Sequence, residues 1–265
     1  LVVLPLGDSI TYGCGDNCTS RCSDVLPCVD CLKNRTYTPC ARCSSGYRLL
    51  LWRRLLASGI TSIMVGPLSE GPEGAPAPAV QHAGWPGIRI SGSASPGHTE
   101  GLVQAAQLWG PFAAKAHAIL LHIGTNDILQ NEYSNSTAAA NDMAAQLTVL
   151  LAQIHRLAPQ ATVYVASLIS FAPTEEYVAF NEQVAAFNTA IPPVVDAYLA
   201  GGGKALFVDM AKRSSMTCRA PGYCCPGGIH PTMQGYSKMA SVWQDTLITR
   251  KADSAVAHQP DPGLS

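Results

Sequence analysis

Ser9 and His230 are of residue types that suit nucleophilic chemistry at an acyl carbon. Ser9 follows an apolar run, Leu1–Leu6, and His230 lies in the segment Gly228–Thr232. A serine hydroxyl is a weak nucleophile and needs a base within hydrogen-bond reach, most often a histidine. The reaction also needs N–H donors for the oxyanion of the transition state, because losing one donor costs about 10²-fold or more in rate.

Several N–H groups are candidates for that oxyanion hole. Ser9 offers its own backbone N–H, and Asn126 offers a side-chain amide. Gly87 offers a backbone N–H that a ligand can approach closely, because glycine has no Cβ. Gly84 is the rival to Gly87 for this role. With His230 as the base, these groups complete a set for acyl transfer that needs no metal and no organic cofactor.

Apolar runs and helical periodicity predict alternating strands and helices. We expect strands at 1–6, 60–66, 116–124, 161–169 and 204–210, and helices at 46–59, 100–112, 135–158, 174–199 and 232–249. This alternation predicts a parallel sheet with helices on both faces. Functional sites of such α/β folds lie at the carboxyl ends of the strands. Each candidate group follows a strand, so all of them should meet at that edge.

The sequence resembles the SGNH (GDSL-type) hydrolases. The blocks "PLGDSITYG", "HIGTND" and "GIHPT" occur in the order of that family. With "QHAGWPGIRI" as the second block, the chain is most similar to the carbohydrate-esterase branch that includes acetylxylan esterases. The resemblance covers nearly the whole chain except residues 14–45 and the tail. It implies an α/β, flavodoxin-like three-layer sandwich with a five-stranded parallel sheet, a single hydrolase domain over residues 1–250 and a disulfide-rich insertion at 14–45.

The same resemblance implies a role for each candidate residue. Ser9 would be the nucleophile, His230 the general base, and Ser9, Gly87 and Asn126 the oxyanion hole. Gly87 fits the family pattern better than Gly84. The implied protein is a secreted serine esterase that removes acyl groups, above all O-acetyl groups, from carbohydrate esters. A general short-chain esterase or lipase-like hydrolase is the alternative enzyme, and a catalytically silent carbohydrate-binding relative is the alternative of another class.

One position departs from the family pattern. The family places an aspartate three residues before the histidine, where this chain has Gly227. That acid orients the imidazole and stabilises its cation. Either a backbone carbonyl near residues 225–227 takes its place and the enzyme works as a Ser-His dyad, or the chain has lost its chemistry. We favour the dyad, because a truncated triad still catalyses. Asp209 is a possible substitute acid, although capping at the strand end suits it better.

Four further residues of these blocks are candidates for substrate contact or for structural roles. His82 and Trp85 are candidates for substrate contact, but a structural hydrogen bond and core packing are the alternatives. Asp8 and Asp127 are expected to hold loops through backbone N–H groups.

Ten cysteines and three glycosylation sequons indicate an oxidising compartment. The sequons are at Asn17, Asn34 and Asn135. Seven cysteines lie between residues 14 and 45, and the others are Cys218, Cys224 and Cys225. C-x-x-C pairs at 28–31 and 40–43 have zinc-like spacing, but zinc would leave three cysteines of the insertion unexplained. We therefore expect disulfides and no metal. If all ten cysteines pair, at least one disulfide joins the insertion to the loop before His230.

The composition limits the partners. Of 265 residues, 47% are hydrophobic and 13% charged, which excludes disorder for most of the chain. The net charge of −1 favours neither nucleic acid nor an anionic membrane as a partner. No apolar run approaches the roughly 18 residues that span a bilayer. We expect a monomer whose partner is its ester substrate, with a flexible tail at residues 251–265.

Overall fold

A parallel β-sheet forms the centre of the molecule. The computed structural model describes residues 1–15, 45–92, 101–218, 223–224 and 228–256. Its strands are β1 (Val2–Gly7), β2 (Ile63–Met64), β3 (Ala83–Gly84), β4 (Ala118–His122), β5 (Thr162–Ala166) and β6 (Ala205–Val208). They pair in parallel in the order β2-β1-β4-β5-β6, and β3 pairs with β1. The predicted parallel sheet is confirmed, and β3 is a short addition that the sequence did not reveal.

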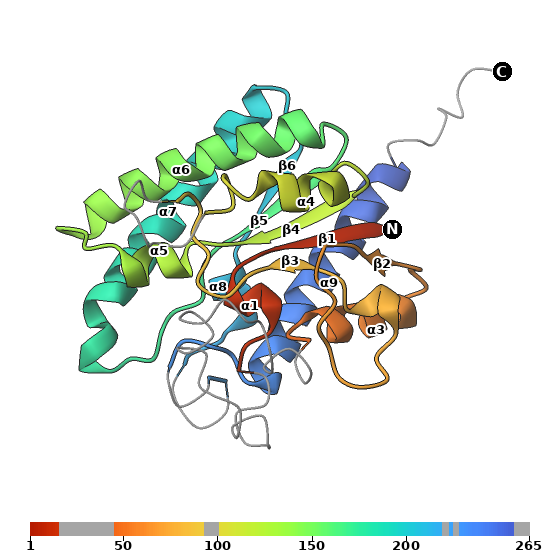
Figure 1. Ribbon diagram of the computed structural model, residues 1–265, viewed down its shortest axis with the longest axis horizontal. Coiled ribbons are helices and arrows are strands. Elements are labelled where there is room, and N and C mark those ends of the chain that lie inside the picture. The colour runs from red at the N-terminus through yellow and green to blue at the C-terminus, as the bar shows by residue number, and fades with distance from the viewer. Residues whose placement is uncertain (16–44, 93–100, 219–222, 225–227, 257–265) are drawn as a thin grey trace.

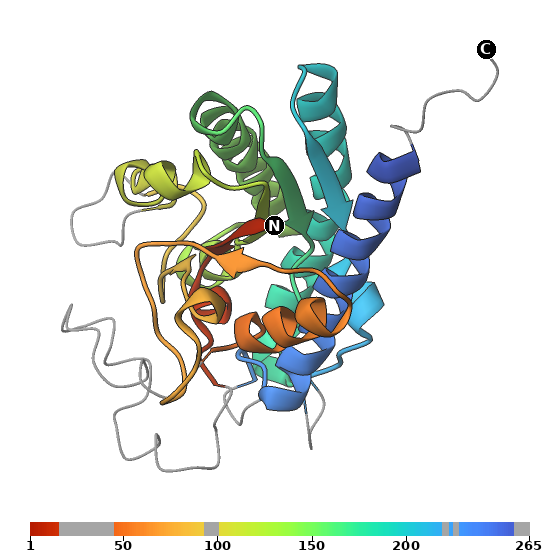
Figure 2. The same cartoon turned by 90° about the vertical axis from the view of Figure 1, so that its right-hand side faces the viewer.

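Helices cover both faces of the sheet (Figures 1 and 2). The α-helices are α1 (Ser9–Tyr12), α3 (Arg48–Ala57), α4 (Ala106–Ala113), α5 (Thr125–Gln130), α6 (Ser136–Leu157), α7 (Val178–Ala200), α8 (Met210–Ser214) and α9 (Met233–Val256). Helices α4 to α7 enclose one core with Trp109 and Phe187, and α3 and α9 enclose the other with Tyr47 and Trp243. The three-layer flavodoxin-like sandwich is thereby confirmed.

The largest differences from the predicted helix boundaries are at the start of α4 and the end of α9. Helix α4 begins at Ala106 rather than near residue 100. The N–H groups of Leu102 and Val103 bond the carbonyls of Arg89 and Ile90 instead of starting a helix. Helix α9 continues to Val256, so the segment predicted as a tail from residue 251 begins as helix. Asn135 caps α6, and its side-chain oxygen accepts the N–H of Ala138 at 2.9 Å.

Some predictions lie outside the described residues. These are the cysteine insertion beyond residue 15, the sequons at Asn17 and Asn34, and Gly227, which replaces the family's acid. Within the described part of the chain, no helix is both long and apolar enough to cross a membrane.

Candidate active site

Ser9 lies where β1 turns into α1. Asp8 caps this short helix, because its Oδ1 accepts the N–H of Ile10 at 2.9 Å. Ser9 is the first residue of α1 and is only 5% exposed. Gly7 precedes this turn at the point where β1 passes closest to β4. A Cβ on Gly7 would overlap the carbonyl oxygen of His122, so only glycine lets the two strands meet directly before the turn.

His230 lies beside Ser9 although 221 positions separate the two residues. Its Nε2 is 2.8 Å from Ser9 Oγ, a distance at which the serine O–H donates to a neutral imidazole. The loop that carries it is attached at several points. Gly228 accepts the N–H of Ala172 at 2.8 Å, and the N–H of Thr232 donates to Tyr223 at 3.0 Å. A disulfide between Cys218 and Cys224 closes the segment before it.

The surroundings of His230 keep its imidazole neutral. Desolvation by the surrounding protein lowers the pKa of His230 to about 4. Among the described residues no carboxylate bonds its Nδ1, and Gly227 lies outside them. Asp209 does not replace the missing acid, because its Oδ1 accepts Lys212 N–H at 3.1 Å and caps α8. The capping role predicted for Asp209 is confirmed.

Asn126 bonds the backbone of the residue that follows Gly87. Asn126 donates one Nδ2 hydrogen to the Ile88 carbonyl at 3.0 Å, which leaves its second amide hydrogen for another acceptor. Gly87 has a φ of +80°, in the left-handed region that favours glycine. Gly84 already donates its N–H to His82 Nδ1 at 3.1 Å. The choice of Gly87 over Gly84 as an oxyanion donor stays a prediction.

Asp8 and Asp127 hold backbone as expected. The Asp127 carboxylate accepts the N–H of Ile90 at 3.0 and 3.2 Å, and Asp8 caps α1. Burial raises the pKa of each carboxyl to about 7, although the N–H bonds and, for Asp127, the positive charge of Arg89 act in the opposite direction. Their loops thus depend on carboxyl groups that change charge near neutral pH.

His82 and Trp85 are both buried, and His82 makes the structural hydrogen bonds that were its alternative role. His82 is fully buried, and its Nε2 lies 2.7 Å from Glu70 Oε2. Since Nδ1 accepts the Gly84 N–H, Nε2 carries the proton. Burial, and then the charge of Arg48, lowers the pKa of His82 to about 3. Trp85 is 8% exposed and packs in the core. The structural alternative is supported for His82, and substrate contact by Trp85 stays a prediction.

Arg48 is a buried residue of this region that sequence reasoning missed. Its guanidinium donates to four backbone carbonyls and is 0% exposed. The acceptors are Thr11 at 3.2 Å, Tyr12 at 2.9 Å, Glu70 at 3.0 Å and Val80. It therefore links α1, which carries Ser9, to the loop that leads into the second block. An arginine on an amphipathic helix gives no sequence signal of burial, because its usual place is the solvated face.

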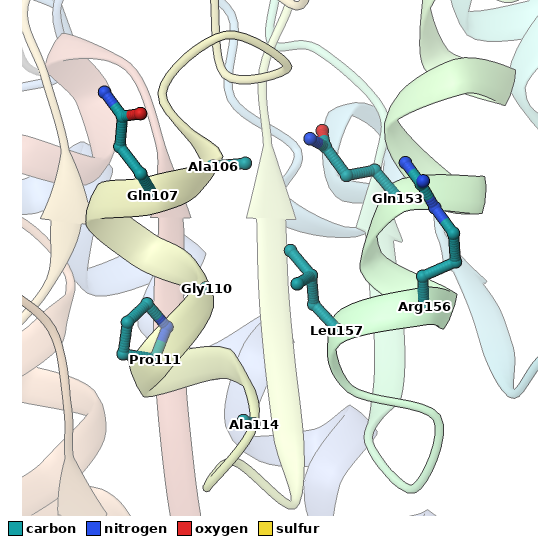
Figure 3. A pocket seen from close by; sticks show the side chains of 8 residues that line it. All are labelled: Ala106, Gln107, Gly110, Pro111, Ala114, Gln153, Arg156 and Leu157. Carbon is teal, nitrogen blue, oxygen red and sulfur yellow. The ribbon is translucent and has the colours of Figure 1, made fainter.

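A cavity of about 550 Å³ lies apart from Ser9 and His230, between α4 and α6 (Figure 3). Its lining residues are Ala106, Gln107, Gly110, Pro111, Ala114, Gln153, Arg156 and Leu157. The carboxyl-terminal turns of α4 and α6 lead into the amino ends of β4 and β5, the sheet edge opposite to Ser9. The cavity is therefore separate from the candidate active site.

The described residues hold no group of three or more histidine, cysteine, aspartate or glutamate side chains that could bind a metal ion. Of the three sequon asparagines, Asn135 lies within the described residues and is exposed at the start of α6. Its glycosylation stays a prediction.

The comparisons with known proteins agree with this fold. The GDSL-like lipase/acylhydrolase family model matches residues 6–238. A family 3 carbohydrate esterase of Clostridium thermocellum has 24% identity and a TM-score of 0.65, with 95% of this chain and 98% of that chain covered. A family 3 carbohydrate esterase from Talaromyces cellulolyticus has 18% identity and a TM-score of 0.62, with 96% of this chain and 99% of that chain covered. A carbohydrate acetylesterase of Sinorhizobium meliloti has 14% identity and a TM-score of 0.60, with 94% of this chain and 99% of that chain covered.

A comparison with curated proteins found no match. The structural likenesses, all at low identity, show the shared fold. The family match covers most of the chain and includes Ser9, Gly87, Asn126 and His230. The chain therefore belongs to the GDSL-like lipase/acylhydrolase family and is a carboxylic ester hydrolase.

Proposed function

We propose that this protein is a serine esterase that removes O-acetyl groups from carbohydrates by a Ser-His mechanism. The observation that carries the mechanism is the 2.8 Å separation between Ser9 Oγ and His230 Nε2. That contact supplies the nucleophile with a base, which is the minimum that serine chemistry requires.

Ser9 Oγ attacks the ester carbonyl carbon while His230 Nε2 takes the serine proton. The tetrahedral oxyanion receives hydrogen bonds from the N–H groups of Ser9 and Gly87 and from the Asn126 amide. The intermediate collapses, the alcohol leaves with the proton from His230, and the acetyl group stays on Ser9. Water then attacks the acyl-enzyme with His230 again as the base, and acetate leaves.

The O-acetyl carbohydrate substrate is supported by the likeness to three carbohydrate esterases, one of them a carbohydrate acetylesterase. A fold alone serves many acyl esters, so the substrate needs its own test. We expect acetate release from acetylated xylan, and faster turnover of an aryl acetate than of an aryl octanoate. Preference for octanoate with no release from xylan would favour a lipase-like hydrolase. No turnover of any ester together with carbohydrate binding would favour the silent relative.

The pH dependence of kcat/KM tests the state of His230. The neutral imidazole is the base, and a lowered pKa keeps it neutral to lower pH. Activity is therefore lost only as the pH falls through an apparent pKa of about 4, rather than the ordinary value of about 6.5. Initial rates with an aryl acetate measure this, with circular dichroism as the control for folding at each pH. A limb between about pH 6 and 7 would contradict the prediction, whether His230 or the carboxyl groups of Asp8 and Asp127 titrate there.

We also propose that the protein is secreted. The disulfide between Cys218 and Cys224 supports an oxidising compartment. With this pair formed, Cys225 is the remaining cysteine outside the insertion, so complete pairing would join it to a cysteine of residues 14–45. Peptide mapping without reduction would detect that bridge. Cys225 recovered as a thiol, or bound zinc, would contradict it.

A further inference from the structure

The second block is attached to α5 residue by residue. Each of the residues 87–90 bonds a side chain of α5 or of the residue after it. Two backbone carbonyls accept from α5: that of Gly87 from Gln130 Nε2 at 2.9 Å, and that of Ile88 from Asn126 Nδ2 at 3.0 Å. Arg89 Nη1 donates to Asn131 Oδ1 at 2.8 Å. The Ile90 N–H donates to the Asp127 carboxylate at 3.0 Å.

Gln130 differs from its neighbours because it lies outside the sequence blocks. Asn126 and Asp127 belong to "HIGTND", whereas Gln130 is the last residue of α5. It lies four positions after Asn126, so the two side chains share one face of the helix. Asn126 and Gln130 therefore reach consecutive carbonyls of the same loop, and Gln130 bonds the residue that offers the backbone oxyanion donor.

This bond restricts a residue that has unusual freedom. Gly87 adopts a φ of +80°, and glycine populates both signs of φ with little energetic preference. The Ile88 N–H donates to the Trp85 carbonyl at 3.2 Å, so Gly87 is the third residue of a tight turn. The bond from Gln130 adds a restraint on the Gly87 carbonyl and so on the peptide plane that follows it. Gln130 is half-buried, so its hydrogen bond to the Gly87 carbonyl is partly shielded from competing water.

We propose that Gln130 is a positioning residue of the oxyanion hole. By holding the Gly87 carbonyl, it keeps the Gly87 N–H aimed at the position of the oxyanion. The proposal rests on the proposed function, in which Gly87 is a donor. The oxyanion is absent from the bound ester and forms only in the transition state and the tetrahedral intermediate, so the effect belongs in kcat rather than in KM.

Gln130→Met tests this role, because methionine has a similar length and no N–H donor. We expect kcat for an aryl acetate to fall about 10- to 100-fold, up to the loss seen when one donor is removed outright. KM should stay within about twofold. Gln130→Glu, which places an acceptor against the same carbonyl, should lower kcat at least as much.

Gln153→Met is the matched control. Gln153 is also half-buried and donates its Nε2 to a backbone carbonyl, that of Val103, at 3.1 Å. It lies in α6, and its side chain bonds Val103 rather than any of the residues 87–90. Both variants should lower the melting temperature by a similar small amount, but Gln153→Met should keep the wild-type kcat.

A double-mutant cycle separates positioning from a general effect. Gly87→Ala places a side chain on a residue with left-handed backbone, and the resulting strain displaces the Gly87 N–H independently of Gln130. If Gln130 acts through Gly87, adding Gln130→Met to Gly87→Ala should change kcat by less than twofold, about the limit of additivity error. A full additional loss of kcat would overturn the proposal.

The outcomes also separate this proposal from the proposed function. A wild-type protein that turns over no ester would overturn both. A wild type that hydrolyses esters, with Gln130→Met as active as Gln153→Met, would overturn the role of Gln130 alone. A kcat loss restricted to the Gln130 variants, with KM unchanged, is the result that the proposal predicts.

Discussion

Ser9→Ala is expected to lower kcat for an aryl acetate by about 10⁴- to 10⁶-fold, because it removes the nucleophile. Ser9 Oγ is the atom that His230 Nε2 contacts at 2.8 Å, so no acyl-enzyme can form without it. The residual rate would come from binding and from the remaining oxyanion donors. A fluorophosphonate probe should label the wild type at Ser9 and leave Ser9→Ala unlabelled.

Ser62→Ala is a matched control for the loss of a buried hydroxyl. Ser62 is 5% exposed, as is Ser9, but its Oγ has no hydrogen-bond partner. Ser62→Ala should keep wild-type turnover and labelling. Removal of a nucleophile lowers kcat far more than about 100-fold. If Ser9→Ala retained more than about a hundredth of the wild-type kcat, another residue would have to be the nucleophile.

The parts of the fold that were predicted from the sequence depend on local signals. The apolar runs around β1, β4 and β5 predicted buried parallel strands, and Asn135 signalled the start of α6 by its capping chemistry. Topology then placed Ser9 and His230 at one sheet edge, since parallel strands deliver their carboxyl ends together. Their 2.8 Å contact is the geometric consequence.

The parts that were not predicted depend on hydrogen bonds between distant segments. Residues 101–103 look helical by periodicity, but their backbone pairs with Arg89 and Ile90, and so α4 begins later. Gln130 looks like any polar residue at a helix end until its partner, Gly87, is known. His82 borders a sequence block and suggests substrate contact, yet Glu70 and the Gly84 N–H occupy its two nitrogens. Such bonds leave no periodic trace in the sequence.

Loss of Arg48 should cost much stability, because its buried guanidinium donates to several backbone carbonyls. Thr11 and Tyr12 are the last residues of α1, where helical carbonyls have no intrahelical partner. Arg48 bonds both. It also bonds the Glu70 carbonyl, and the Glu70 carboxylate in turn accepts from His82. A single buried cation thus satisfies the end of the Ser9 helix and a second loop.

We expect Arg48→Met to lower the free energy of unfolding by about 3–5 kcal/mol, because it leaves several buried carbonyls without donors. For a chain of this size that corresponds to a melting temperature lower by roughly 10 °C. Arg48→Lys should recover only part of the loss, since an ammonium cannot reproduce the fork of guanidinium donors. Urea unfolding monitored by circular dichroism measures all three proteins.

Arg54→Met provides the comparison on the same helix. Arg54 is half-buried in α3 and donates to a single side chain, Ser237 Oγ, at 3.0 Å. Because water can replace that donor, the variant should lose about 1 kcal/mol or less. If Arg48→Met were no less stable than Arg54→Met, the four carbonyls would have to find other partners, and the link between α1 and the second-block loop would not depend on Arg48.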